Sequence, residues 1–228
     1  MDKIQNWTEK VPKHLKNDCI KDKTYPKTLI KNNSMILAIG MTGSGKTNSI
    51  VEYLSRTQGK WYNIIIFTGS NPDEPIYNYL KEAIPDIIIT NDLEELPTIE
   101  QYADCDKTQP KLIIFDDSVL SEPKTLKIIS KWYMCARKLC FTCIFLAQDY
   151  HKVPVFIRRN VHYLQLFKMT DRRDLTRLFD KVAGEIPIDT MLKIYEKSTL
   201  HPGQFLTINL RGTTPKEKFK SNFIGNIF

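Results

Sequence analysis

The chain has 228 residues, 42% of them hydrophobic, and carries a formal net charge of +7 with a pI near 9.0. This length allows one domain with a substantial core and short appendages, and the basic charge favours a polyanionic partner, nucleic acid before a membrane surface. No apolar run approaches the roughly 18 residues of a transmembrane helix and the first residues lack an apolar signal region, so we expect neither a membrane span nor a secretory leader.

Residues 1–33 are polar and rich in lysine, and Pro12 and Pro26 interrupt any long helix. We expect a basic N-terminal arm that wraps loosely over the core. Its charge fits a solvated surface or, as the alternative, a contact with DNA.

The next stretch is organised as strand, glycine loop and helix. The apolar run Met35–Ile39 predicts a buried parallel strand, and residues 47–56 predict a helix. Between them, residues 40–47 match G-x-x-x-x-G-K-[ST], the phosphate loop of P-loop NTPases. The alternative, a glycine turn that matches by chance, is disfavoured by the flanking strand and helix. The predicted nucleotide-binding residues are Gly40, Met41, Thr42, Gly43, Ser44, Gly45, Lys46, Thr47 and Asn48.

Each part of this loop has a role in binding ATP. The glycines let the backbone N–H groups turn inward around phosphate oxygens, and the N-terminus of the following helix favours an anion. Lys46 can reach the β- and γ-phosphates, and the Thr47 hydroxyl can ligate Mg²⁺. The expected ligands are therefore ATP and Mg²⁺.

Strands and helices continue to alternate after the P-loop. Residues 61–68 predict a second buried strand, residues 74–83 a helix and residues 86–90 a short strand. The acid-rich stretch 91–110 predicts a helix and a loop.

A second chemical signal follows at residues 111–118, where four apolar residues precede two carboxylates. This is a Walker B pattern about 70 residues after the P-loop. Asp116, at the end of the predicted strand, would hold Mg²⁺ directly or through water. Asp117 could accept a proton from the attacking water. The alternative is a strand that merely ends in two solvated carboxylates.

Residues 122–137 predict a helix, and Phe141–Ala147 predicts a further buried strand that Gln148 closes. A polar side chain at the end of the strand beside Walker B can form a hydrogen bond to the γ-phosphate or to the attacking water. A residue in this position acts as the sensor of the nucleotide. An amide that is merely exposed at a strand end is the alternative. The remaining elements are a lead-in at 153–160, a strand at 161–167, a basic amphipathic helix at 169–183 and a strand at 204–210. We therefore divide the chain into an arm at 1–33, an ATPase domain at 34–210 and a basic C-terminal tail at 211–228.

The chain has five cysteines, an odd number, and several lie in apolar stretches. We expect reduced core thiols in an intracellular compartment. Cys135, Cys140 and Cys143 have the C-x4-C-x2-C spacing that begins an iron–sulfur pattern, but they straddle a helix end and an apolar strand.

The predicted order of elements indicates an α/β fold with a mainly parallel sheet and helices on both faces. An additional strand is expected between the Walker A and Walker B strands. This is typical of RecA-like P-loop proteins, and it argues against a P-loop kinase or GTPase.

The sequence resembles the FtsK/HerA superfamily of DNA-pumping ATPases and, within it, the A32-like genome-packaging ATPases of large eukaryotic DNA viruses. The resemblance is carried by residues 40–47, 112–117 and 137–148, and it covers roughly residues 34–170. It implies that Arg137 is an arginine finger acting on a neighbouring subunit's nucleotide, and that Gln148 is the sensor. Arg158 and Arg159 are reserve candidates for the finger. Many relatives have Glu where this chain has Asp117.

The resemblance implies an ATP-driven translocase that packages double-stranded viral DNA into a capsid. Asp117 and Gln148 would orient the attacking water, and an arginine in trans requires a homo-oligomeric ring, a pentamer or hexamer, with DNA in its hole. DNA contacts should be mainly to phosphates. Capsid proteins are further candidate partners, and the expected location is the host-cell cytoplasm or a virus factory, with the virion as an alternative.

Three other functions remain open from the sequence. One is a different RecA-like nucleic-acid motor, such as a helicase or a conjugation-type ATPase. A second is a small-molecule kinase that transfers phosphate to a nucleoside. The third is a nucleotide-bound assembly protein of the virion that hydrolyses little ATP.

Overall fold

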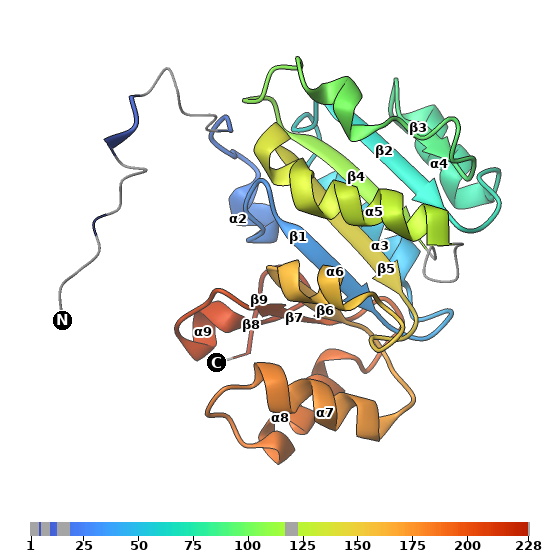
Figure 1. Ribbon diagram of the computed structural model, residues 1–228. Coiled ribbons are helices and arrows are strands. Elements are labelled where there is room, and N and C mark those ends of the chain that lie inside the picture. The colour runs from blue at the N-terminus through green and yellow to red at the C-terminus, as the bar shows by residue number, and fades with distance from the viewer. Residues whose placement is uncertain (1–4, 6–9, 13–18, 117–122, 228) are drawn as a thin grey trace.

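A computed structural model describes residues 5, 10–12, 19–116 and 123–227 of the chain. Within this part, nine strands form one sheet in the order β3-β2-β4-β5-β1-β6-β7-β8-β9 (Figure 1). The strands are β1 (Met35–Ile39), β2 (Asn63–Thr68), β3 (Ile88–Thr90), β4 (Lys111–Asp116), β5 (Phe141–Ala147), β6 (Tyr163–Leu166), β7 (Leu206–Asn209), β8 (Phe219–Ser221) and β9 (Gly225–Asn226). The helices are α2 (Tyr25–Thr28), α3 (Lys46–Arg56), α4 (Pro75–Ala83), α5 (Pro123–Cys135), α6 (Val155–Asn160), α7 (Arg172–Val182), α8 (Ile188–Ser198) and α9 (Pro215–Lys218), with short 3₁₀ helices η2 (Ile99–Tyr102) and η4 (Ala136–Leu139).

The first six strands pair in parallel, and β7, β8 and β9 extend the sheet with antiparallel pairs. Strand β5 lies between β1, which leads into the P-loop, and β4, which carries Walker B. This order confirms the predicted α/β fold and the additional strand between the two Walker strands. Parallel strands place their carboxyl ends at one edge of the sheet, so the Walker motifs and Gln148 share that edge.

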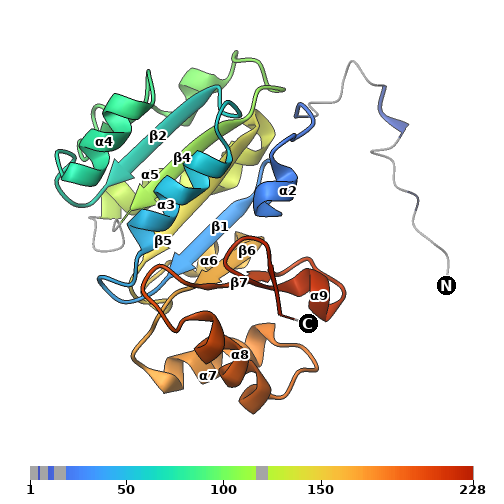
Figure 2. The same ribbon diagram turned by 180° about the vertical axis from the view of Figure 1, so that it is seen from behind.

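Both faces of the sheet are covered, which explains why the central strands are apolar without interruption. Along β1, Ile36 and Ala38 pack with α3 and α4 on one face, whereas Leu37 and Ile39 pack with α5 and α6 on the other. Figure 2 shows α3 and α4 in front of the sheet, and Figure 1 shows α5 and α6 in front of the opposite face. Alternate residues of one strand therefore serve two separate apolar layers.

Several C-terminal elements differ from the sequence expectation. The lead-in at 153–160 is largely helix α6, whose N-cap is Pro154. Helix α8 was not predicted, although Met191, Leu192 and Tyr195 form a buried stripe at helical spacing. Strands β8 and β9 lie where a tail was expected. They are three and two residues long, too short for any periodic signal, and Phe219 anchors β8 in the core.

The segment before β1 packs against the core from residue 19 onward. Its contacts include a hydrogen bond from the Ile20 N–H to the Thr108 carbonyl (2.9 Å) and an ion pair between Asp22 and Lys60 (2.7 Å). Cys19 thereby reaches Cys140 at the start of β5, with Cα atoms 6.0 Å apart, and the two form a disulfide. The expectation of reduced core thiols is therefore wrong for this pair, because the fold brings together two cysteines that are distant in sequence.

Candidate nucleotide-binding site

The P-loop connects the carboxyl end of β1 to the first turn of α3. Gly45 has a φ of +94°, a conformation that L side chains rarely adopt. Gly40 lies so close to β6 and the loop that an added Cβ would be 2.4 Å from the Phe167 Cβ and 2.7 Å from the Ser44 Oγ. At these two positions the pattern's glycines are required by conformation and by space.

Lys46 is the first residue of α3, and it is 6% exposed. Its Nζ donates hydrogen bonds to the carbonyls of Gly40 (2.8 Å) and Met41 (3.1 Å), so the side chain folds back over the loop. The charge is thus held inside the curve of the loop, where it can meet an anion. Met41, Thr42 and Asn48 are exposed around this curve.

A hydrogen bond joins the two Walker motifs. The Thr47 hydroxyl donates to Oδ2 of Asp116 at 3.1 Å, although the residues are 69 positions apart. Asp116 is 3% exposed, at the end of β4. A hydroxyl and a carboxylate in contact provide the oxygen ligands that Mg²⁺ prefers.

Tyr77 of α4 also takes part in this contact, although no motif in the sequence marks it. Its hydroxyl donates to the same Oδ2 of Asp116 at 2.8 Å. Burial and the charge of Asp116 raise the pKa of Tyr77, so the phenol stays protonated and keeps donating. The sequence could not reveal this role, because no local pattern shows that α4 packs beside Walker B.

Gln148 directly follows β5, between the ends of β1 and β4. The adjacent Ala147 carbonyl accepts a hydrogen bond from the Gly40 N–H at 3.2 Å, so the end of β5 is joined to the P-loop. Asp117, the predicted catalytic base, lies outside the described residues.

Arg137 lies in η4, before β5 begins, and its side chain is exposed. Because β5 and β1 are parallel, this position is at the sheet edge opposite the P-loop of the same chain. Arg158 donates from Nε to the Val153 carbonyl (2.9 Å) and covers the ring of Tyr150, whereas Arg159 is exposed. The parallel pairing therefore places Arg137 away from the P-loop of its own chain.

Two C-terminal segments support the P-loop from outside. The Met41 N–H donates to the Lys168 carbonyl (2.9 Å), and the Gly203 N–H donates to the Ser44 carbonyl (2.9 Å). Neither residue carries a motif that a sequence search could find. The shape of the P-loop therefore depends on two segments that lie more than 100 residues later in the sequence, at Lys168 and Gly203.

A comparison of the sequence with profiles of known protein families shows which family the chain belongs to. The sequence profile described as poxvirus A32 protein matches residues 22–182, more than two thirds of the chain. The chain belongs to the poxvirus A32 protein family. This confirms the predicted A32-like resemblance. No curated protein matches the sequence significantly.

Solved structures of low sequence identity share the fold of this A32 family member. The DNA-packaging ATPase B204 from Sulfolobus turreted icosahedral virus is 14% identical and has a TM-score of 0.58, over 85% of this chain and 98% of that one. B204 from Sulfolobus turreted icosahedral virus 2 in complex with ATP-gammaS is 14% identical with a TM-score of 0.55, covering 83% and 97%. The type VII secretion ATPase EccC of Thermomonospora curvata is 16% identical with a TM-score of 0.55, covering 86% and 26%.

These likenesses confirm a P-loop ATPase fold.

Among the residues that the structure describes, no helix is both long and apolar enough to cross a bilayer.

Proposed function

We propose that the protein is an ATPase that uses ATP hydrolysis to move double-stranded DNA, and that it packages a viral genome into a capsid. Membership of the A32 family and a fold shared with DNA-packaging ATPases support this function. The observation that carries it is the hydrogen bond between Thr47 and Asp116, because it joins both Walker motifs in one site.

The residues of this site fit a magnesium nucleotide. The P-loop and the start of α3 offer backbone N–H groups, and Lys46 offers a positive charge to the β- and γ-phosphates. Thr47 and Asp116 would hold Mg²⁺, which when bound neutralises charge on the phosphate oxygens. Tyr77 keeps the Asp116 carboxylate oriented toward Thr47.

Asp117 and Gln148 are the residues we assign to the attacking water, Asp117 as the base and Gln148 as the sensor. The location of Gln148 between the two Walker strands supports its role.

Arg137 is assigned to the nucleotide of a neighbouring subunit. Its place at the edge opposite its own P-loop supports action in trans, and this requires a ring, which we propose contains five or six copies. DNA in the central hole would be gripped through its phosphates, and capsid proteins would dock the ring. Such a motor would act in the host-cell cytoplasm or a virus factory.

The test is ATP turnover with and without double-stranded DNA, with the native mass measured on the same preparation. We expect turnover to require Mg²⁺ and rise with DNA, and DNA affinity to fall steeply with salt. Lys46→Ala should abolish turnover, whereas Lys193→Ala, which removes an exposed lysine of α8, should not. Full activity of Lys46→Ala would overturn the P-loop assignment. Absence of DNA binding at low salt would overturn the motor.

A further inference from the structure

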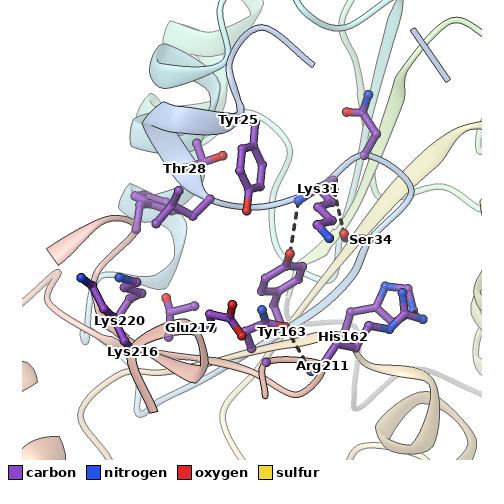
Figure 3. Close-up of a pocket in the computed structure, with 16 residues that line it drawn as sticks. Tyr25, Thr28, Lys31, Ser34, His162, Tyr163, Arg211, Lys216, Glu217 and Lys220 are labelled. Carbon is purple, nitrogen blue, oxygen red and sulfur yellow. Dashed lines mark hydrogen bonds between the residues drawn. The ribbon is translucent and has the colours of Figure 1, made fainter. Parts of the chain in front are cut away.

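A cavity lies away from the P-loop, at the beginning of β1. It has a volume of about 490 Å³, within the range of small-molecule sites, and lies between the segment before β1 and the C-terminal segment (Figure 3). Ser34 borders the cavity just before β1, whereas Gly40 follows the end of the same strand. The length of that strand, about 17 Å, separates the cavity from the nucleotide site.

The lining of this cavity is positively charged. Glu217 is the carboxylate among the lining residues, and its Oε2 already accepts hydrogen bonds from the Thr213 N–H (3.1 Å) and hydroxyl (2.9 Å). No ion pair among the described residues involves any of the lining cations. The cavity therefore favours an anion. Its cations are Lys31, Arg211, Lys216 and Lys220.

His162 fixes one of these cations at the cavity wall. The Arg211 Nη2 lies 2.7 Å from the His162 Nε2, and the Met35 N–H lies 3.3 Å from the His162 Nδ1. Both neighbours are donors, so the ring nitrogens face hydrogen-bond donors and a protonated imidazole is disfavoured. Burial and the charges of Arg211 and Arg137 lower the pKa of His162 to about 4, in agreement with a neutral ring. His162 thus orients the Arg211 guanidinium without neutralising its positive charge.

Aromatic side chains complete the site. The buried Tyr163 accepts a hydrogen bond from the Lys31 N–H at 3.3 Å, which joins the segment before β1 to β6. Tyr25 is 37% exposed, and its hydroxyl points into the cavity, across from Lys216 and Lys220 (Figure 3). An accessible tyrosine ring beside cations is a combination that holds a base together with its phosphate.

We propose that this cavity binds a nucleoside phosphate, with Lys31, Arg211 and Lys216 around the phosphate and Tyr25 against the base. The nucleoside phosphate is either a free nucleotide or part of a DNA strand. The DNA source rests on the proposed motor function, whereas the free-nucleotide source does not.

The test uses the full chain with Lys46→Ala, which disables the P-loop. A fluorescent AMP analogue and a short fluorescein-labelled DNA duplex are titrated separately, without Mg²⁺, and binding is read by anisotropy. Adding Lys31→Gln with Lys216→Gln should weaken at least one probe by about tenfold or more. Adding Tyr25→Ala should weaken the same probe by about fivefold or more, and Tyr25→Phe should retain binding because the ring remains.

The matched control is Lys124→Gln with Lys127→Gln, which removes the same charge from exposed positions of α5. Weaker AMP binding in the cavity variant but not in the control identifies a free-nucleotide site, and loss confined to the duplex identifies a DNA site. Equal binding by the cavity and control variants, or binding of neither probe by the parent, overturns the proposal. If no chain binds the duplex, the motor function fails, and the AMP titration alone decides the cavity. Equal denaturant-unfolding midpoints of the parent chain and of the Lys31→Gln with Lys216→Gln variant show that the fold is intact.

Discussion

Gly45 of the P-loop and Gly203 of the turn before β7 lie against each other, backbone to backbone. A Cβ added to Gly45 would be 2.6 Å from the Gly203 Cα and 2.7 Å from its nitrogen. The Gly203 N–H also donates to the carbonyl of the neighbouring Ser44 at 2.9 Å. The C-terminal turn therefore lies directly against the P-loop, and it leaves no space for a side chain at Gly45.

Replacing Gly45 with alanine should weaken nucleotide binding by at least about tenfold, because the new Cβ pushes the loop and the turn apart. Gly59→Ala is the matched control. Gly59 also has a positive φ, +73°, but an added Cβ meets nothing within 4 Å. The free energy of unfolding of this variant should therefore fall by about 1–2 kcal/mol through backbone strain, and its nucleotide affinity should not change. Nucleotide titration and denaturant unfolding of both variants separate the two effects. Equal nucleotide affinity would show that the contact is unimportant.

Tyr77→Phe removes the hydroxyl that donates to Asp116 and leaves the ring in the core. We expect the Mg²⁺ concentration needed for half-maximal turnover to rise by about tenfold, since partners that orient a metal-binding carboxylate typically contribute this much. The control is Tyr79→Phe on the same helix, where the side chain is 59% exposed. A magnesium titration that gives the same midpoint for both variants would remove Tyr77 from the site.

Asp117→Asn should still bind ATP but hydrolyse it slowly, by a factor of about 100 or more, because the base is lost while Asp116 remains for the metal. Affinity and turnover should be measured on one preparation. An equal loss of both would mean that Asp117 is a structural or metal-binding residue.

Arg137→Ala should abolish ATP turnover at the nucleotide site of the neighbouring subunit, and leave the nucleotide site of its own chain intact. Arg137→Ala chains keep an intact nucleotide site, and Lys46→Ala chains keep an intact Arg137, so each alone should be inactive. A mixture of the two should recover part of the activity in rings where a good site meets a good arginine. Near-normal turnover of Arg137→Ala, with loss in Arg158→Ala or Arg159→Ala, would move the assignment to that pair.

The free energy of unfolding should fall as the pH is lowered from about 6.5 to about 4, in part because of His162. Its pKa is about 4 in the fold and 6.5 in the unfolded chain, so the unfolded state binds more protons in this window. Between pH 7 and 5 the loss should be about 1–2 kcal/mol. His162→Gln should reduce it, whereas His201→Gln, at an exposed position, should not. Denaturant unfolding at both pH values gives the answer, and identical pH slopes in the two variants would contradict the assignment.

The local sequence was sufficient to place the P-loop, Asp116 and Gln148 at one edge of the sheet. Glycine spacing at residues 40–47, the apolar run before Asp116 and the strand before Gln148 are patterns within one strand or one turn. Parallel strands bring their carboxyl ends to a common edge, so these patterns also predicted which residues meet. The predicted additional strand between the two Walker strands is β5.

Only the tertiary structure decided the contacts that surround this edge. Tyr77 meets Asp116 across 39 positions, and Gly203 meets the P-loop from the far end of the chain. The pairing of Cys19 with Cys140 and of Arg211 with His162 also joins segments that are distant in sequence. Such contacts depend on how helices and edge strands pack in three dimensions, and no local periodicity or motif records that packing.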